Sequence, residues 1–183
     1  MKQPLILFVL MFIPVLGIGQ FSERYLELYK TVEKIDSTKI STTFKNGNPK
    51  TIGTITDFKY NDQFYSLPTG KYITHFRNGD KQVLQYDSYG NDLIHKYYNK
   101  NGLLITEYQY IHTDSNAKHL DELFNGDSDY TVILELRHYK ISKIDGTNYL
   151  YKKGRFKNGK KIGTWTYYLP DGTIKKEIIK SNQ

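Results

Sequence analysis

The stretch that decides the fold lies near the end of the chain: Gly163-Thr-Trp165-Thr-Tyr-Tyr168-Leu-Pro-Asp-Gly172. A second copy, from Gly70 to Gly79, also has glycines nine residues apart and an aromatic residue two positions after the first glycine. A third copy shares the second half, because two tyrosines precede Gly102 at the offsets that separate Tyr167 and Tyr168 from Gly172. The recurrence predicts one local structure built several times along the chain.

The glycines of the repeat predict hairpin turns. Asn-Gly and Asp-Gly pairs tolerate positive φ and are typical of two-residue turns between strands. Five such pairs mark the candidate turns: Asn46-Gly47, Asn78-Gly79, Asn101-Gly102, Asn158-Gly159 and Asp171-Gly172. Segments rich in aromatic and β-branched residues flank them, at 103–110, 130–141, 149–156 and 164–169. We therefore expect a mainly β protein, a meandering antiparallel sheet of stacked hairpin repeats. The residues expected to shape it are Gly70, Gly79, Gly102, Gly159, Gly163, Gly172, Tyr167 and Tyr168.

The C-terminal repeat carries a family resemblance. The run Tyr-Lys-Lys-Gly-Arg-Phe-Lys-Asn-Gly-Lys-Lys-Ile-Gly-Thr-Trp at 151–165 resembles a MORN repeat, and Leu-Pro-Asp-Gly172 followed by Glu177 resembles its bacterial variant. The likeness is good over about residues 149–180, fair over 70–110, faint over 44–53 and lacking over 111–148. It implies a meandering antiparallel sheet without catalytic residues. Many proteins of this family are labelled antitoxin components of toxin–antitoxin systems, a role for which an exported protein is badly placed.

The N-terminus indicates export. Lys2 precedes nine apolar residues, Leu5 to Ile13, and Gly17-Ile-Gly19 resembles a cleavage site, so residues 1–19 are predicted to be a signal peptide. The alternative is a membrane anchor, but the apolar stretch falls short of the roughly 20 residues that span a bilayer. The sequence has no cysteine, which excludes a lipid-attached lipoprotein and a disulfide framework. The expected product is a secreted or periplasmic protein.

Residues 20–183 are expected to form one domain with three parts. Ser22 is placed to cap a helix over 22–35, whose apolar face would cover an end or a face of the sheet. The repeats are expected over about 39–110 and 149–180. An acidic insertion, 111–129, would form a solvated loop with a short helix at 117–124. A calcium site in this loop is the alternative, although the order of ligands in an EF-hand is lacking.

No catalytic or cofactor-binding constellation is present in the sequence. The five histidines do not show the His-Glu-x-x-His spacing of a zinc site, and neither a Gly-x-Ser-x-Gly elbow nor a phosphate-binding glycine loop occurs. We therefore predict a protein that is not an enzyme and needs no cofactor. Glu107 and Glu177 occupy the same repeat position and are expected to pair with lysines across strands.

Charge is concentrated in the last repeat. The chain has a net charge of +7, and residues 152–180 hold nine basic residues against two acidic ones. A basic surface beside aromatic rings would attract an anionic lipid or an acidic glycan; the alternative is that lysines protect a sheet edge from aggregation. The candidate anion-binding residues are Lys152, Lys153, Arg155, Lys157, Lys160, Lys161 and Trp165.

The sequence thus predicts an exported interaction or scaffold module. An unknown protein partner is the first expectation. Binding of an anionic lipid or glycan through the C-terminal repeat is the second, and an antitoxin-like or metal-binding protein is the third. No specific nucleic acid is expected, although a basic patch would bind one without sequence preference.

Overall fold

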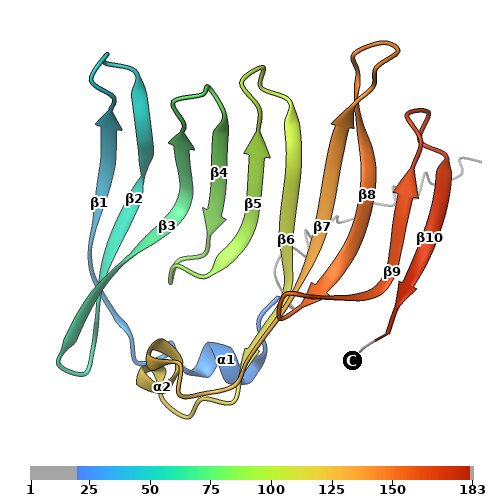
Figure 1. Ribbon diagram of the computed structural model, residues 1–183. Helices are drawn as coiled ribbons and strands as arrows, with labels where there is room; N and C mark the ends of the chain where they lie inside the picture. The colour runs from blue at the N-terminus through green and yellow to red at the C-terminus, as the bar shows by residue number, and fades with distance from the viewer. Residues whose placement is uncertain (1–19, 182–183) are drawn as a thin grey trace, which may run out of the picture.

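A computed structural model describes residues 20–181 as one ten-stranded antiparallel sheet with two short helices (Figure 1). Each strand pairs with the next along the chain, so the predicted meander is confirmed. The predicted signal peptide lies outside the described residues. Within them, no helix is long and apolar enough to cross a membrane. The strands are β1 (Glu33–Thr43), β2 (Pro49–Tyr60), β3 (Gln63–His75), β4 (Lys81–Tyr86), β5 (Asp92–Tyr98), β6 (Leu104–Ser115), β7 (Tyr130–Ile141), β8 (Asn148–Lys157), β9 (Lys160–Tyr168) and β10 (Ile174–Lys180), and the helices are α1 (Glu23–Glu27) and α2 (Leu120–Asn125).

The turn glycines behave as predicted, but most of the turns are one residue longer. All five have φ between 78° and 90°. Only Asn158-Gly159 forms a two-residue turn, with positive φ at both positions. At Gly47, Gly79, Gly102 and Gly172 the loop has three residues, as shown by bonds such as Phe44 N–H to the Asn48 carbonyl. This is the turn in which a left-handed glycine closes a bulge, so the residue before the glycine keeps negative φ.

The first glycine of the repeat has a different role, which is to form a bulge. Gly70 and Gly163 have φ of 64° and 62°, and each begins a three-residue segment opposite a single glycine of the preceding strand. The aromatic residue at the third position lies on that glycine. A Cβ at Gly53 would approach Tyr72 Cδ2 to 2.3 Å, and one at Gly154 would approach Trp165 Cδ2 to 2.3 Å. The repeat therefore encodes a bulge and a ring packed on a bare backbone.

The N-terminal helix is shorter than predicted. Ser22 caps it as expected, with its hydroxyl oxygen accepting from Tyr25 N–H at 3.1 Å. The helix ends at Glu27 instead of continuing to residue 35, and β1 begins at Glu33. β-branched residues such as Val32 and Ile35 favour extended backbone. Pairing with β2 adds tertiary hydrogen bonds that a longer helix would forgo.

Both helices fill a gap at the lower end of the sheet. The turn between β4 and β5 ends higher than its neighbours, and α1 and α2 lie beneath it, between the long β2–β3 hairpin and β6–β7 (Figure 1). The cluster at their contact, called the plug here, is the buried core there. Its members are Tyr25, Leu28, Tyr29, Tyr60, Ala117 and Leu120. The predicted helix thus covers an end of the sheet.

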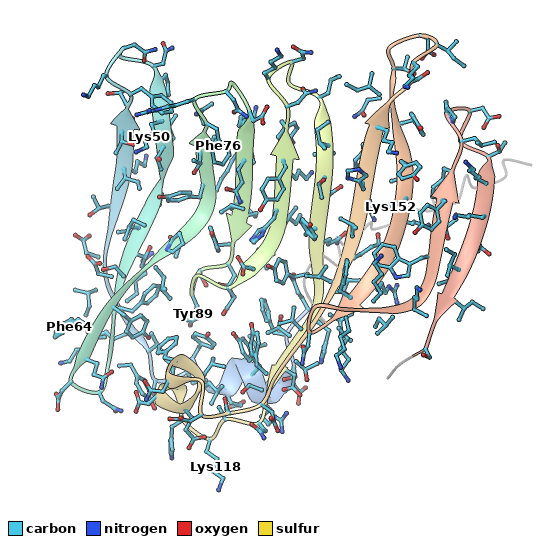
Figure 2. All side chains as sticks on the ribbon, viewed as in Figure 1. Lys50, Phe64, Phe76, Tyr89, Lys118 and Lys152 are labelled. Atoms are coloured by element: carbon cyan, nitrogen blue, oxygen red, sulfur yellow. The ribbon has the colours of Figure 1, made fainter. Side chains whose placement is uncertain are left out.

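Tyrosine hydroxyls tie the plug to the turn above it. Asn91 Oδ1 accepts hydrogen bonds from the hydroxyls of Tyr25 and Tyr29, at 2.8 and 2.9 Å. Tyr89, in the same turn, points at the helices (Figure 2), and its ring lies 5.2 Å from that of Tyr29. Burial is the main cause that raises the pKa of Tyr29 to about 12. The plug is therefore a satisfied polar-aromatic core that stays neutral at physiological pH.

The insertion is shorter than its predicted range of 111–129. Strand β6 continues to Ser115, and its last residues pair with the start of β7. Asp114 is held there by Arg24, with a 2.6 Å ion pair. Polar residues such as Asp114 suggested a loop here. In the fold they belong to β6, and the partner of Asp114 on α1 is distant in the sequence. The remaining loop contains α2, close to the short helix expected at 117–124.

Candidate functional site

The strand register sorts the side chains of β7–β10 onto two faces. Residues directly opposite one another in neighbouring strands share a face. Lys96, Glu107, Arg137, Lys153 and Thr166 are linked in this way from β5 to β9. We call this side the ion-pair face. A second row on the other side consists of Tyr97, Thr106, His138, Lys152, Tyr167 and Lys176; we call that side, over β7–β10, the lysine–tyrosine face.

Part of the ion-pair face balances its charges across strands. Glu107 lies 3.3 Å from Lys96 Nζ and 3.7 Å from Arg137, and Arg137 lies 2.7 Å from Glu135. The expected pairing of Glu107 with a lysine is thus confirmed. Glu177, at the same repeat position, instead accepts a 3.0 Å hydrogen bond from the Thr166 hydroxyl. Glu135 and Glu177 are the acidic residues within strands β7–β10, and both lie on this face.

The lysine–tyrosine face has cations lying on aromatic rings. Lys140 Nζ is 3.6 Å from the centroid of the Tyr151 ring. Lys176 Nζ is 4.9 Å from that of Tyr167, and the two tyrosine rings meet edge to face at 5.8 Å. Lys152, which Figure 2 labels, lies on the same face, because it is opposite His138 in the register of β7 with β8. Since neither strand acid lies here, the face combines positive charge with flat ring surfaces.

The pKa of His138 reflects burial and the positive charges of this face. Burial is the first cause that lowers its pKa below 6.5, and the positive charges of Lys152 and Lys140 lower it further. Its Nδ1 lies 3.1 Å from the Thr106 hydroxyl. His138 is therefore neutral at physiological pH, and the lysines carry the positive charge of the face.

The structure divides the predicted anion-binding set between the two faces. Lys152 and Lys161 lie on the lysine–tyrosine face, because Lys161 is opposite Phe156 and its Nζ is 4.6 Å from the centroid of the Trp165 ring. Trp165 is only 1% exposed, because its ring packs on Gly154 and against Phe156, so it is not presented to a ligand. The other four basic residues lie on the ion-pair face: Lys153, Arg155, Lys157 and Lys160.

Lys140, Tyr151 and Lys176 also lie on this face and were absent from the sequence-based set. Lys176 directly precedes Glu177 in β10, so alternation within that strand could have placed it on the face opposite to the acid. Lys140 and Tyr151 lie on opposite sides of a turn, and Tyr151 is the extra residue where the register shifts between β7 and β8. Pairwise alternation from the sequence would have assigned one of them to the wrong face.

Two grooves on the surface lie away from the lysine–tyrosine face. Grooves of about 650 and 550 Å³ separate the upper turns of neighbouring hairpins. Phe76 and Arg77 line both of them. They are spaces between successive repeats, away from β7–β10, and the candidate site is a flat face instead.

Acidic residues of the insertion are engaged locally. Glu122 accepts a 2.9 Å hydrogen bond from Lys118 N–H, and the Asn116 side chain donates to Asp129 at 3.1 Å. Among residues 20–181, no three histidine, aspartate or glutamate side chains are grouped to hold a metal ion. The calcium alternative gains no support from this geometry.

No protein-family model, curated protein or solved structure matches the chain. The likeness to MORN repeats therefore depends on the residues quoted for it.

Proposed function

We propose that the protein is an exported, non-enzymatic interaction module that binds an acidic carbohydrate polymer on its lysine–tyrosine face. The antiparallel sheet is the rigid support, and MORN-like repeats set the spacing of its side chains. A scaffold role follows, because such a face can hold a large ligand without acting on it.

The carrying observation is that the acidic residues of strands β7–β10 lie on one face only. Lys140, Lys152, Lys161 and Lys176 share one side of β7–β10, while Glu135 and Glu177 lie on the other. Unpaired cations on a surface without nearby acids raise the local concentration of anions. If Glu135 and Glu177 had shared the face of these four lysines, the positive potential at that face would be weaker.

The aromatic component favours a carbohydrate over a bilayer. Tyr151 and Tyr167 are partly buried, and aromatic rings with hydroxyls suit the C–H and hydroxyl groups of a sugar. Insertion into a membrane requires apolar side chains that reach several ångströms into the lipid. Trp165, the largest side chain of this region, is buried against Gly154 and Phe156. We therefore place an anionic lipid second as the ligand.

Two charge-matched variants test the proposal. The first replaces Lys140, Lys152, Lys161 and Lys176 by glutamine on the lysine–tyrosine face. The second replaces Lys153, Arg155, Lys157 and Lys160 by glutamine on the ion-pair face. Both remove four positive charges from strands within β7–β10, so net charge is equal in the two proteins. Binding to heparin and to a polyuronate is measured for each at two salt concentrations.

We expect the parent and the second variant to bind in a salt-sensitive manner, and the first variant to lose binding. Salt sensitivity follows because the Debye length falls from about 30 Å at 0.01 M to about 10 Å at 0.1 M. Equal loss in both variants would show that net charge alone attracts the ligand. If the parent protein binds anionic vesicles but neither polysaccharide, the ligand is a lipid. If the parent binds none of them at low salt, the lysine–tyrosine face is not an anion-binding site.

A further inference from the structure

Both outer edges of the sheet are open. Among residues 20–181, β1 pairs only with β2, and β10 pairs only with β9. Along an edge strand, alternate residues direct their N–H and C=O groups away from the sheet, where they lack partners. Large apolar side chains are also exposed there: Ile35 is 48%, Ile174 is 59% and Ile179 is 80% exposed. Each edge therefore offers a template for another strand.

The strand count determines which direction an added strand would take. With ten strands, each antiparallel to the next, β10 runs opposite to β1. A second copy placed alongside by translation would bring its β1 next to β10. The two strands would then be antiparallel, as are all neighbours within one sheet. The hairpin pattern would thus continue from one copy into the next.

Charge distinguishes this pairing from a symmetric one. β10 carries three lysines and one glutamate, so pairing two β10 edges would bring together two strands that are both net positive. β1 balances its charges, with Glu33, Lys34, Asp36 and Lys39. The lysines of β10 therefore oppose pairing of β10 with itself, a recognised protection of sheet edges, while a β1 edge meets no such repulsion.

We propose that the edge formed by β10 binds the β1 edge of a second copy, so that the protein assembles head to tail into a continuous sheet. Such an interface uses two different surfaces and does not close on itself, which allows rows of more than two copies. The proposal depends on backbone edges and is independent of the ligand proposed for the lysine–tyrosine face.

The lack of cysteine makes cross-linking a clean test. Single-cysteine variants are made in β1 (Ser41→Cys), in β10 (Ile179→Cys) and at the exposed tip of the β5–β6 hairpin (Lys100→Cys). Each is treated with a short bis-maleimide, alone and in pairwise mixtures. Thermal unfolding checks that the three exposed substitutions leave the fold intact. Sedimentation of the parent over a range of concentrations measures the size of the assembly.

The expected result is cross-linked dimer in the mixture of Ser41→Cys with Ile179→Cys and only background dimer in every other sample. The parent should grow with concentration to species larger than a dimer. Cross-linking of Ile179→Cys with itself would show a symmetric β10 pair and overturn the proposal. A monomer at all concentrations, or equal yields in mixtures containing Lys100→Cys, would overturn it too.

Discussion

The lower end of the molecule and the sheet above it are built on different principles. At the lower end, the plug joins parts of the chain that are distant in sequence, such as Tyr25 and Leu120, around a buried cluster. In the upper sheet, each strand meets only its sequential neighbours, and few side chains are fully buried. The upper sheet therefore resembles a repeat array, whose stability is a sum of local terms.

This difference has a consequence for cooperativity. Loss of a local term in a repeat array weakens one hairpin and its neighbours. Loss of the plug would uncouple the β2–β3 hairpin from β6–β7, because the short β4–β5 hairpin alone would connect their lower ends (Figure 1). The plug is thus where a single change should affect the whole domain.

The largest effect is expected from Leu120→Ala in the plug. Leu120 is 0% exposed, so the truncation leaves a cavity and should lower the free energy of unfolding by roughly 2–5 kcal/mol. Ile179→Ala, at an 80% exposed position of β10, is the matched control and should change it by about 0.5 kcal/mol or less. Urea unfolding measures both. An equal decrease in the free energy of unfolding of the two variants would show that the plug does not stabilise the fold more than an exposed strand position does.

A smaller effect is expected where a ring lies on a glycine. Gly154→Ala would place a methyl group 2.3 Å from Trp165 Cδ2 and should cost about 1–3 kcal/mol through overpacking. Gly53→Ala should behave alike against Tyr72, because the two bulges share one geometry. In the Trp165→Leu background, Gly154→Ala should cost less, which a double-mutant cycle of unfolding free energies measures. Additive costs would mean that the ring and the glycine are not coupled.

The smallest effect concerns the pH dependence of the upper sheet. The pKa of His138 is lowered in the folded state from 6.5, chiefly by burial, so the unfolded chain takes up a proton more readily. Stability from this neutral imidazole is present above about pH 6.5 and is lost as the pH falls toward the folded pKa. His138→Gln should flatten this part of the melting temperature against pH, measured from pH 7.5 to 5. An unchanged slope would show that His138 does not contribute.

Much of the fold was predictable because its signals are local. The strand at Tyr130–Ile141 matches its predicted bounds, and all five paired turn glycines have positive φ. Positive φ is a property of one residue, and β propensity is a property of a short segment. The end of α1 was not predictable in the same way. The apolar spacing continues to Ile35, and only the partner strand β2 makes extended backbone the better choice there.

The candidate site shows the same limit more sharply. The sequence identified a basic, aromatic C-terminal repeat, yet the seven chosen residues include four on the ion-pair face and one buried tryptophan. Alternation holds within an uninterrupted strand, as it does for Trp165, Thr166 and Tyr167. A bulge that adds one residue, as the one beside Tyr151 does, reverses the faces beyond it. The shift opposite Gly154 adds two residues and keeps the alternation, so the faces there follow from the pairing with β8.

The sequence by itself determined where this chain reverses, which segments are strands and where positive charge gathers, because these depend on residues close together in the chain. The tertiary structure alone decided which lysines share a face, which aromatic ring is buried, and that two short helices close the lower end. Those features depend on register and on contacts between distant residues. A one-residue shift in register moves every later side chain of a strand to the other side of the sheet.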